Sequence, residues 1–145
     1  MSVPLNKREL SHIQFLWELY QFNIRLGEIC ENSPKKYRAN YADFIIKSGL
    51  EALQLAQYGN SIYLSKSTTD EEFLEREMSF KKAESLIDNI ATTAQIFLEF
   101  TRRNGVSSEK IAKRQEYIGT KANEIIALLK GVQKSDKERI KKLRS

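Results

Sequence analysis

Apolar residues return every three or four positions along almost the whole chain, and this spacing restricts the possible folds more than any other feature. Over residues 6–32 the polar side chains recur with the same alternation, and apolar side chains fill a wide arc between them. Nowhere do apolar and polar residues alternate as they would in a half-buried strand. The sequence therefore predicts an all-helical protein.

Proline, glycine and capping residues divide this periodic sequence into segments. Ser33 is a good N-cap, and Pro34 suits the first position of a helix. Thr68 and Thr69 are each followed three residues later by a glutamate, which makes two overlapping capping boxes. Gly105 is expected to stop the third helix. The expected helices cover about residues 6–32, 34–64, 70–104 and 108–132.

Four long helices joined by short turns favour antiparallel neighbours, because a short connection returns the chain alongside the helix that it has just left. We therefore expect an all-α, antiparallel up-down-up-down four-helix bundle formed by residues 1–133. The alternative is a pair of helical hairpins that fold only as an oligomer. Gly49, in the second segment, either permits close helix packing or is tolerated at a cost of about 1 kcal/mol relative to alanine.

The formal net charge of +5 belongs entirely to the C-terminal end of the chain. Residues 1–129 contain 17 Lys/Arg and 17 Asp/Glu, whereas residues 130–145 contain seven Lys/Arg against two acidic residues. Beyond Gly131 the chain can continue as a helix, but only Ile140 and Leu143 remain apolar, so we expect residues 134–145 to form a fraying basic tail. In the expected bundle this tail lies near the acidic stretch Asp70–Glu77 and would partly neutralise it, which argues against a free nucleic-acid-binding arm.

The same topology brings the first and third turns to one end of the bundle, and cations gather there. The expected nucleic-acid-binding residues are Lys35, Lys36, Arg38, Arg102, Arg103, Lys110, Lys113 and Arg114. Lysines in the first turn of a helix oppose its dipole, and an incoming phosphate would relieve that repulsion. Tyr37 and Tyr41 are expected to stack on an exposed base beside such a phosphate. Alternatively, these cations coat a solvated helix end and bind no ligand.

The residues needed for familiar catalytic chemistry are absent from the sequence. His12 is the only histidine and Cys30 the only cysteine, so the chain can assemble neither a histidine–cysteine zinc site nor an intramolecular disulfide. Glu-x-x-His pairs of di-iron bundles, phosphate-binding glycine loops and nucleophile elbows are also missing. We therefore expect a protein that is not an enzyme and uses no metal or cofactor. An enzyme that depends on His12 is the remaining catalytic alternative.

Composition and hydropathy indicate an ordinary globular chain. Hydrophobic residues make up 41% and charged residues 30% of the sequence, which argues against wholesale disorder. No apolar run approaches the ~18 residues that span a bilayer, and the charged N-terminal residues do not form a signal peptide. We expect a cytoplasmic protein that makes no contact with a membrane.

The stretch Ser33-Pro34-Lys35-Lys36-Tyr37-Arg38 lies between an aromatic-rich first helix and a long second helix, and it resembles part of a family of small four-helix bundles. This family includes Avd, the accessory protein of diversity-generating retroelements, and proteins encoded by intervening sequences in large-subunit ribosomal RNA genes. The pattern from Arg76 to Leu86, followed by an Ile/Leu-rich helix, is similar as well. The resemblance covers roughly residues 10–133.

The resemblance implies a barrel-like homo-oligomer, pentameric in known members, with a basic surface that binds RNA or DNA. For Avd it also implies a partner reverse transcriptase. It implies binding roles for Lys35, Lys36 and Arg38. The chain departs from the Avd-type members in its charge, because they are more strongly basic through the body whereas residues 1–129 are balanced here.

Two functions are compatible with these observations. The first is a non-catalytic nucleic-acid-binding accessory protein, resembling the Avd partner of a retroelement reverse transcriptase. The alternative is a protein–protein interaction and assembly module that binds no nucleic acid. This alternative rests on the wide apolar arc of the first helix, which includes Phe15, Trp17, Tyr20 and Phe22 and exceeds what one bundle would bury.

Overall fold

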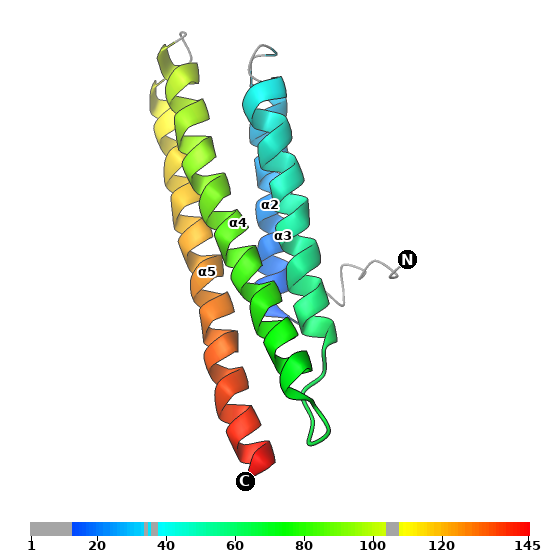
Figure 1. Ribbon diagram of the computed structural model, residues 1–145. Coiled ribbons are helices and arrows are strands. Elements are labelled where there is room, and N and C mark those ends of the chain that lie inside the picture. Colours follow the sequence, from blue (N-terminus) through cyan, green and yellow to red (C-terminus); the bar gives the residue numbers. More distant parts are fainter. Residues whose placement is uncertain (1–12, 34, 36–37, 104–107) are drawn as a thin grey trace.

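The computed structural model describes residues 13–33, 35, 38–103 and 108–145. Its helices, labelled in Figure 1, are α2 (Gln14–Glu31), α3 (Asp43–Ser61), α4 (Asp70–Arg103) and α5 (Ser108–Arg144). A π-helical turn, η2 (Arg38–Ala42), leads directly into α3. The described residues contain no strand, which confirms the prediction of an all-helical protein.

The four long helices lie side by side, and their contacts fit a bundle. α2 contacts α3 and α5, and α4 contacts the same two helices from the other side. In Figure 1 the end of α2 and the start of α3 lie at the same end of the molecule as the end of α4 and the start of α5. The start of α4 and the C-terminus of the chain lie at the opposite end.

The core runs through the middle of this assembly and draws on every helix. Phe15 and Phe80 meet edge to face, with 5.5 Å between their ring centroids. Burial of each large apolar side chain contributes about 1.5–3 kcal/mol, so these contacts dominate the cohesion of the helices. The largest fully buried side chains are Leu16, Leu19, Phe22, Leu26, Ile45, Phe80, Ile87, Ile90, Phe97, Leu98, Ile111 and Ile118.

α2 and α3 approach each other closely at Gly49. A Cβ atom at this position would collide with the side-chain amide of Asn23. The same amide nitrogen donates hydrogen bonds of 3.0 Å to the carbonyl oxygens of Leu19 and Gly49. Gly49 therefore permits close helix packing, which was one of the two roles considered for it.

The expected helix starts are partly right. Thr69 and Glu72 form the predicted capping box, in which each side chain accepts the backbone N–H of the other residue at 3.1 Å. Thr68 does not form the second box with Glu71. Its hydroxyl instead accepts the N–H of Ser65 and donates to the carbonyl oxygen of Tyr63 within the α3–α4 connection.

The expected start of the second helix at residue 34 lies outside the described residues, and the described helical structure runs from η2 into α3. Ser33 was expected to cap a helix starting at residue 34, but its buried hydroxyl donates to the carbonyl oxygen of Ile29 at 2.7 Å and so closes α2. α3 itself begins at Asp43, after η2. Pro34, Gly105 and the expected helical residues 6–12, which include His12, lie outside the described residues.

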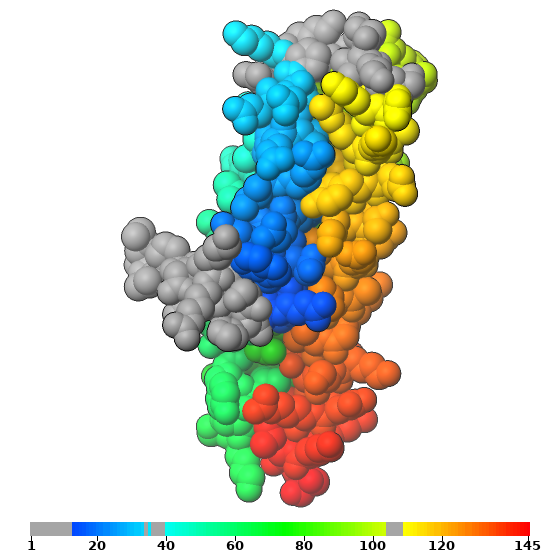
Figure 2. All heavy atoms as spheres, turned by 180° about the vertical axis from the view of Figure 1, so that it is seen from behind, coloured from blue at the N-terminus to red at the C-terminus, as the bar shows by residue number. Residues whose placement is uncertain are grey.

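The expectation of a frayed tail over residues 134–145 is wrong. α5 continues to Arg144, twelve residues beyond the expected end at residue 132. Figure 2 shows this orange-to-red part of α5 beside the green segment that contains the α3–α4 connection. The guanidinium of Arg76 binds the carboxylate of Asp136 with hydrogen bonds of 2.8 and 3.1 Å. This polar contact with α4 and the buried side chain of Ile140 hold the segment against the rest of the molecule.

The expected contact between the tail and the acidic start of α4 is confirmed. Arg144 pairs with Asp70 at 2.6 Å, and the ammonium group of Lys137 lies 4.0 Å from the carboxylate of Glu77. These pairs hold the C-terminal turns of α5 against the N-terminal turns of α4.

Candidate nucleic-acid interface

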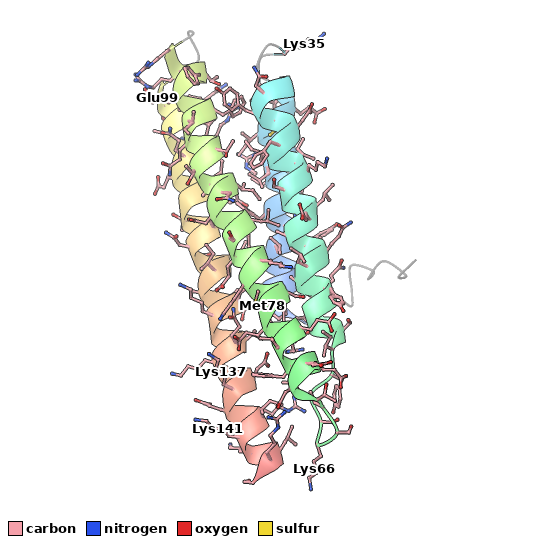
Figure 3. The ribbon with its side chains drawn as sticks, in the orientation of Figure 1. Lys35, Lys66, Met78, Glu99, Lys137 and Lys141 are labelled. Carbon is pink, nitrogen blue, oxygen red and sulfur yellow. The ribbon has the colours of Figure 1, made fainter. Side chains whose placement is uncertain are left out.

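Most of the cations expected to bind nucleic acid lie at one end of the molecule. Arg102 and Arg103 form the last turn of α4, and Lys110 lies in the first turn of α5. In Figure 3, Lys35 and Glu99 are both labelled at this end, although they belong to different parts of the chain. Lys36 and the side chain of Arg38 lie outside the described residues. We call the following set the basic end: Lys35, Arg102, Arg103, Lys110, Lys113 and Arg114.

Two glutamates partly neutralise the basic end. The guanidinium of Arg102 binds both carboxylate oxygens of Glu99, and Arg103 lies 3.6 Å from the same carboxylate. The hydrogen bond from Arg102, together with the charges of both arginines, lowers the pKa of Glu99. Lys113 lies 3.6 Å from Glu109. Exposed pairs of this kind are weak, so a phosphate can replace the carboxylates at little cost.

The other cations of the basic end have no acidic partner among the described residues. Lys35 and Lys110 are exposed, and Arg114 is half-buried. None of the three lies within ion-pairing distance of a carboxylate in the described part of the chain. The basic end therefore keeps an excess of positive charge at the surface, supplied by three separate parts of the chain.

The packing of Tyr41 argues against the predicted stacking of its ring on an exposed base. The Tyr41 ring is half-buried and packs against Phe97 and Phe100, with centroid distances of 5.8 and 6.0 Å. It thereby joins the start of α3 to the end of α4 and belongs to the edge of the core. Tyr37, the other expected stacking residue, lies outside the described residues.

A groove beside these cations went unrecognised in the sequence. It has a volume of about 390 Å³ and is lined by Gln95, Ile96, Glu99, Phe100, Arg103 and Gln115. Ile96 and Phe100 are 48% and 39% exposed, so the groove beside the basic end has an apolar wall. The sequence does contain a signal for this groove. Ile96 and Phe100 are four residues apart and therefore share one face of the helix, and this face differs from the one that carries the core residues Phe97 and Leu98.

A second surface lies across α2 and α3. Phe15 and Phe22 are buried, so they do not belong to the expected excess of apolar residues on the first helix. That excess consists of Trp17 and Tyr20, whose ring centroids are 5.5 Å apart in a stacked arrangement, and exposed Ile24. α3 adds Ile46 and Leu50, which are 39% and 51% exposed. We call the following set the apolar face: Trp17, Tyr20, Ile24, Ile46 and Leu50.

The groups that could support catalysis are sparse in the described structure. In the described ranges, no cluster of three or more His, Cys, Asp or Glu side chains could hold a metal ion. Cys30 is buried, and this burial, with the negative charge of Asp43, raises the pKa of its thiol to about 11. The thiol is therefore protonated near neutral pH and is a poor nucleophile.

Across the described residues, no helix is both long enough and apolar enough to cross a membrane. No protein-family model, curated protein or solved structure matches the chain. The assignment of a function thus rests on the residues and surfaces described above.

Proposed function

We propose that this chain is a non-catalytic binding protein whose basic end binds the phosphate groups of a nucleic acid. The observation that carries the proposal is the convergence of exposed cations from the α2–α3 connection, the end of α4 and the start of α5. Carboxylates pair with only part of this set among the described residues. An accessory role beside a reverse transcriptase is the form of this function that the resemblance around residues 33–38 favours.

The proposal includes the topology of the chain as an up-down-up-down four-helix bundle. It is supported by contacts between α2 and α3, between α3 and α4, between α4 and α5, and between α2 and α5. In such a bundle the first and third connections share one end, and this arrangement gathers the basic residues.

The test compares two triple variants that each remove three positive charges. The basic-end variant is Lys35→Gln, Lys110→Gln and Lys113→Gln. The control variant is Lys47→Gln, Lys66→Gln and Lys82→Gln, all of them exposed lysines outside the basic end. Fluorescence anisotropy of labelled RNA and DNA, measured over a range of salt concentrations, gives the affinity and its salt dependence for each protein.

Each phosphate contact contributes about 0.7–0.9 to the slope of log K against log salt concentration. We expect the basic-end variant to lower the magnitude of the slope by about 2 to 3 and the control variant to lower it by less than 1. If the wild-type protein retains neither RNA nor DNA at low salt, the proposed function is wrong. If both variants lose equal affinity, the basic end is not the binding surface.

The apolar face favours a second candidate function, assembly with other protein chains. Large exposed apolar surfaces commonly mark interaction sites, and Trp17 and Tyr20 supply the aromatic area that interfaces favour. By resemblance the assembly would be a homo-oligomer such as a pentamer.

We expect Ile24→Glu with Leu50→Glu to reduce the mass measured by light scattering. Leu74→Glu, an exposed leucine on α4, is the matched control and should leave the mass unchanged. A wild-type monomer at micromolar concentration would rule out self-assembly.

A further inference from the structure

The C-terminal part of α5 displays a row of lysines that the basic end does not include. Lys130, Lys134, Lys137 and Lys141 are all exposed and are spaced by four, three and four residues, which places them on one face of the helix. At 1.5 Å per residue the row extends over about 16 Å. Figure 3 shows the labelled side chains of Lys137 and Lys141 pointing outward from α5. We call these four residues the lysine row.

Neighbouring positions of this helix are fixed to the rest of the molecule. Asp136 and Ile140 are 7% exposed, and the Asp136 carboxylate is bound by Arg76 of α4. Arg144 adds its ion pair with Asp70 near the end of the helix. The lysine row is therefore presented by an anchored helix, and binding a ligand requires little further ordering of the backbone.

The positive charge of the row is largely uncompensated. Among the described residues, Lys130, Lys134 and Lys141 form no ion pair, and Lys137 lies 4.0 Å from Glu77, which also binds Lys81 at 3.0 Å. Asp136 is engaged by Arg76, so Glu138 is the one acidic side chain exposed between residues 130 and 145. Arg139 extends elsewhere, over the ring of Tyr63.

The neighbourhood of the row distinguishes between anionic partners. None of the exposed large apolar side chains in the described structure belongs to α5, so the helix that carries the row has no such side chain to insert into a lipid bilayer. The row also contains no aromatic side chain on which the bases of a single strand could stack. Regularly spaced ammonium groups on a straight helix suit instead the phosphate backbone of a duplex, which carries its charges along a stiff axis.

We propose that the lysine row is a contact surface for the phosphate backbone of double-stranded nucleic acid. This inference rests on the proposed function and deepens it, because it names the form of nucleic acid and adds a second contact surface on α5. Contacts to phosphate oxygens carry no sequence information, so binding through the row is independent of sequence.

The experiment uses a row variant, Lys130→Gln, Lys134→Gln and Lys141→Gln, beside the control variant defined above. Binding of a labelled duplex and of one of its strands is measured by anisotropy over a range of salt concentrations. We expect the row variant to weaken duplex binding about tenfold or more at low salt and to lower the magnitude of the salt slope by about 2 to 3. Its effect on the single strand should not exceed that of the control variant.

A measurement on the wild-type protein makes the test independent of the folding of any variant. Limited acetylation, analysed by mass spectrometry, should show that bound duplex protects Lys130, Lys134 and Lys141 more strongly than it protects Lys47 and Lys66. Equal protection of both sets would overturn the inference.

The outcomes separate the two proposals. If the wild-type protein binds no nucleic acid, the proposed function fails and the inference fails with it. If the basic-end variant loses binding while the row variant behaves as the control does, only the inference fails. Loss of binding to vesicles of anionic phospholipid by the row variant, without loss of duplex binding, would also overturn it and would point to a membrane surface.

Discussion

Arg76 holds three helical elements together with a single side chain. Its guanidinium binds Asp136 of α5 in a bidentate pair and donates to the carbonyl oxygens of Gly59 and Ile62 at the end of α3, at 3.1 and 3.0 Å. It also lies over the ring of Phe80, 5.0 Å from the centroid. Carbonyl groups in the last turn of a helix lack partners within that helix, so Arg76 both neutralises Asp136 and completes the end of α3.

Replacement of Arg76 by methionine should destabilise the protein strongly. We expect Arg76→Met to lower the free energy of unfolding by about 3–5 kcal/mol, because it leaves the buried Asp136 carboxylate without its partner. Unfolding in urea, followed by circular dichroism, measures this change.

The double variant Arg76→Met with Asp136→Leu tests the cause of that loss. Removing both charges should recover much of the stability, because no isolated charge then remains buried. Arg25→Met is the surface control, since Arg25 pairs with exposed Glu28, and its effect should stay below about 1 kcal/mol. The interpretation is wrong if Arg76→Met costs no more than Arg25→Met.

At the scale of the elements, periodicity and local capping predicted the helices well where neighbouring residues determine the structure. α4 begins at Asp70 after the predicted Thr69–Glu72 box and reaches Arg103, close to the expected bounds. Long-range contacts determined the rest. The extension of α5 depends on a pair between residues 76 and 136, and no local pattern indicates that contact.

The candidate site shows the same division. In the expected topology, Arg102 at the end of α4 and Lys110 at the start of α5 share one end of the molecule with Lys35, and these segments lie at one end in Figures 1 and 3. The fate of Tyr41 could not be predicted in that way, because it depends on how α3 packs on Phe97 and Phe100 of α4. The positive charge of the lysine row is evident from the sequence. Its arrangement on one helix face depends on the C-terminal part of α5, which the sparse apolar residues there did not predict.

Two glycines should respond in opposite ways to replacement by alanine. Gly49→Ala is expected to lower the free energy of unfolding by about 1–3 kcal/mol, because its methyl group collides with Asn23 where α2 and α3 meet. Gly131→Ala on α5 should stabilise the protein by up to about 1 kcal/mol, since nothing lies within 4 Å of the added Cβ and alanine favours the helix. Thermal unfolding of the two variants gives the signs. Stabilisation by both would show that the Asn23 side chain moves away from the added methyl group at little cost.

Cys30 is buried in the core, and the titration of its thiol makes the stability of the whole molecule depend on pH in the alkaline range. Burial, aided by the charge of Asp43, raises the thiol pKa from 9.0 to about 11. The folded state therefore holds the thiol proton more tightly than the unfolded chain does. The resulting stabilisation is complete below pH 9 and is lost as the pH rises toward about 11.

This dependence can be isolated with Cys30→Ala. The difference in unfolding free energy between the wild-type protein and the variant should narrow between pH 9 and about 11, because only the wild-type protein carries the buried thiol. Urea unfolding at a series of pH values measures the difference. A difference that stays constant across this range would contradict the assignment.

The anchoring of α5 also affects how readily a protease can cleave this part of the chain. A chain end rich in lysine and arginine offers trypsin-like enzymes many bonds to cleave, and an unstructured end of this kind is usually the first part removed. Here the bonds after Lys134, Lys137 and Arg139 lie inside α5, which must unwind before a protease can accept it. Because Arg76 joins this part of α5 to α3 and α4, unwinding of the helix as far as Asp136 breaks contacts with both and costs more than the fraying of a free helix end. We therefore expect Arg76→Met to speed the loss of residues 135–145 under limited digestion, because it removes the contact that holds Asp136 against α4.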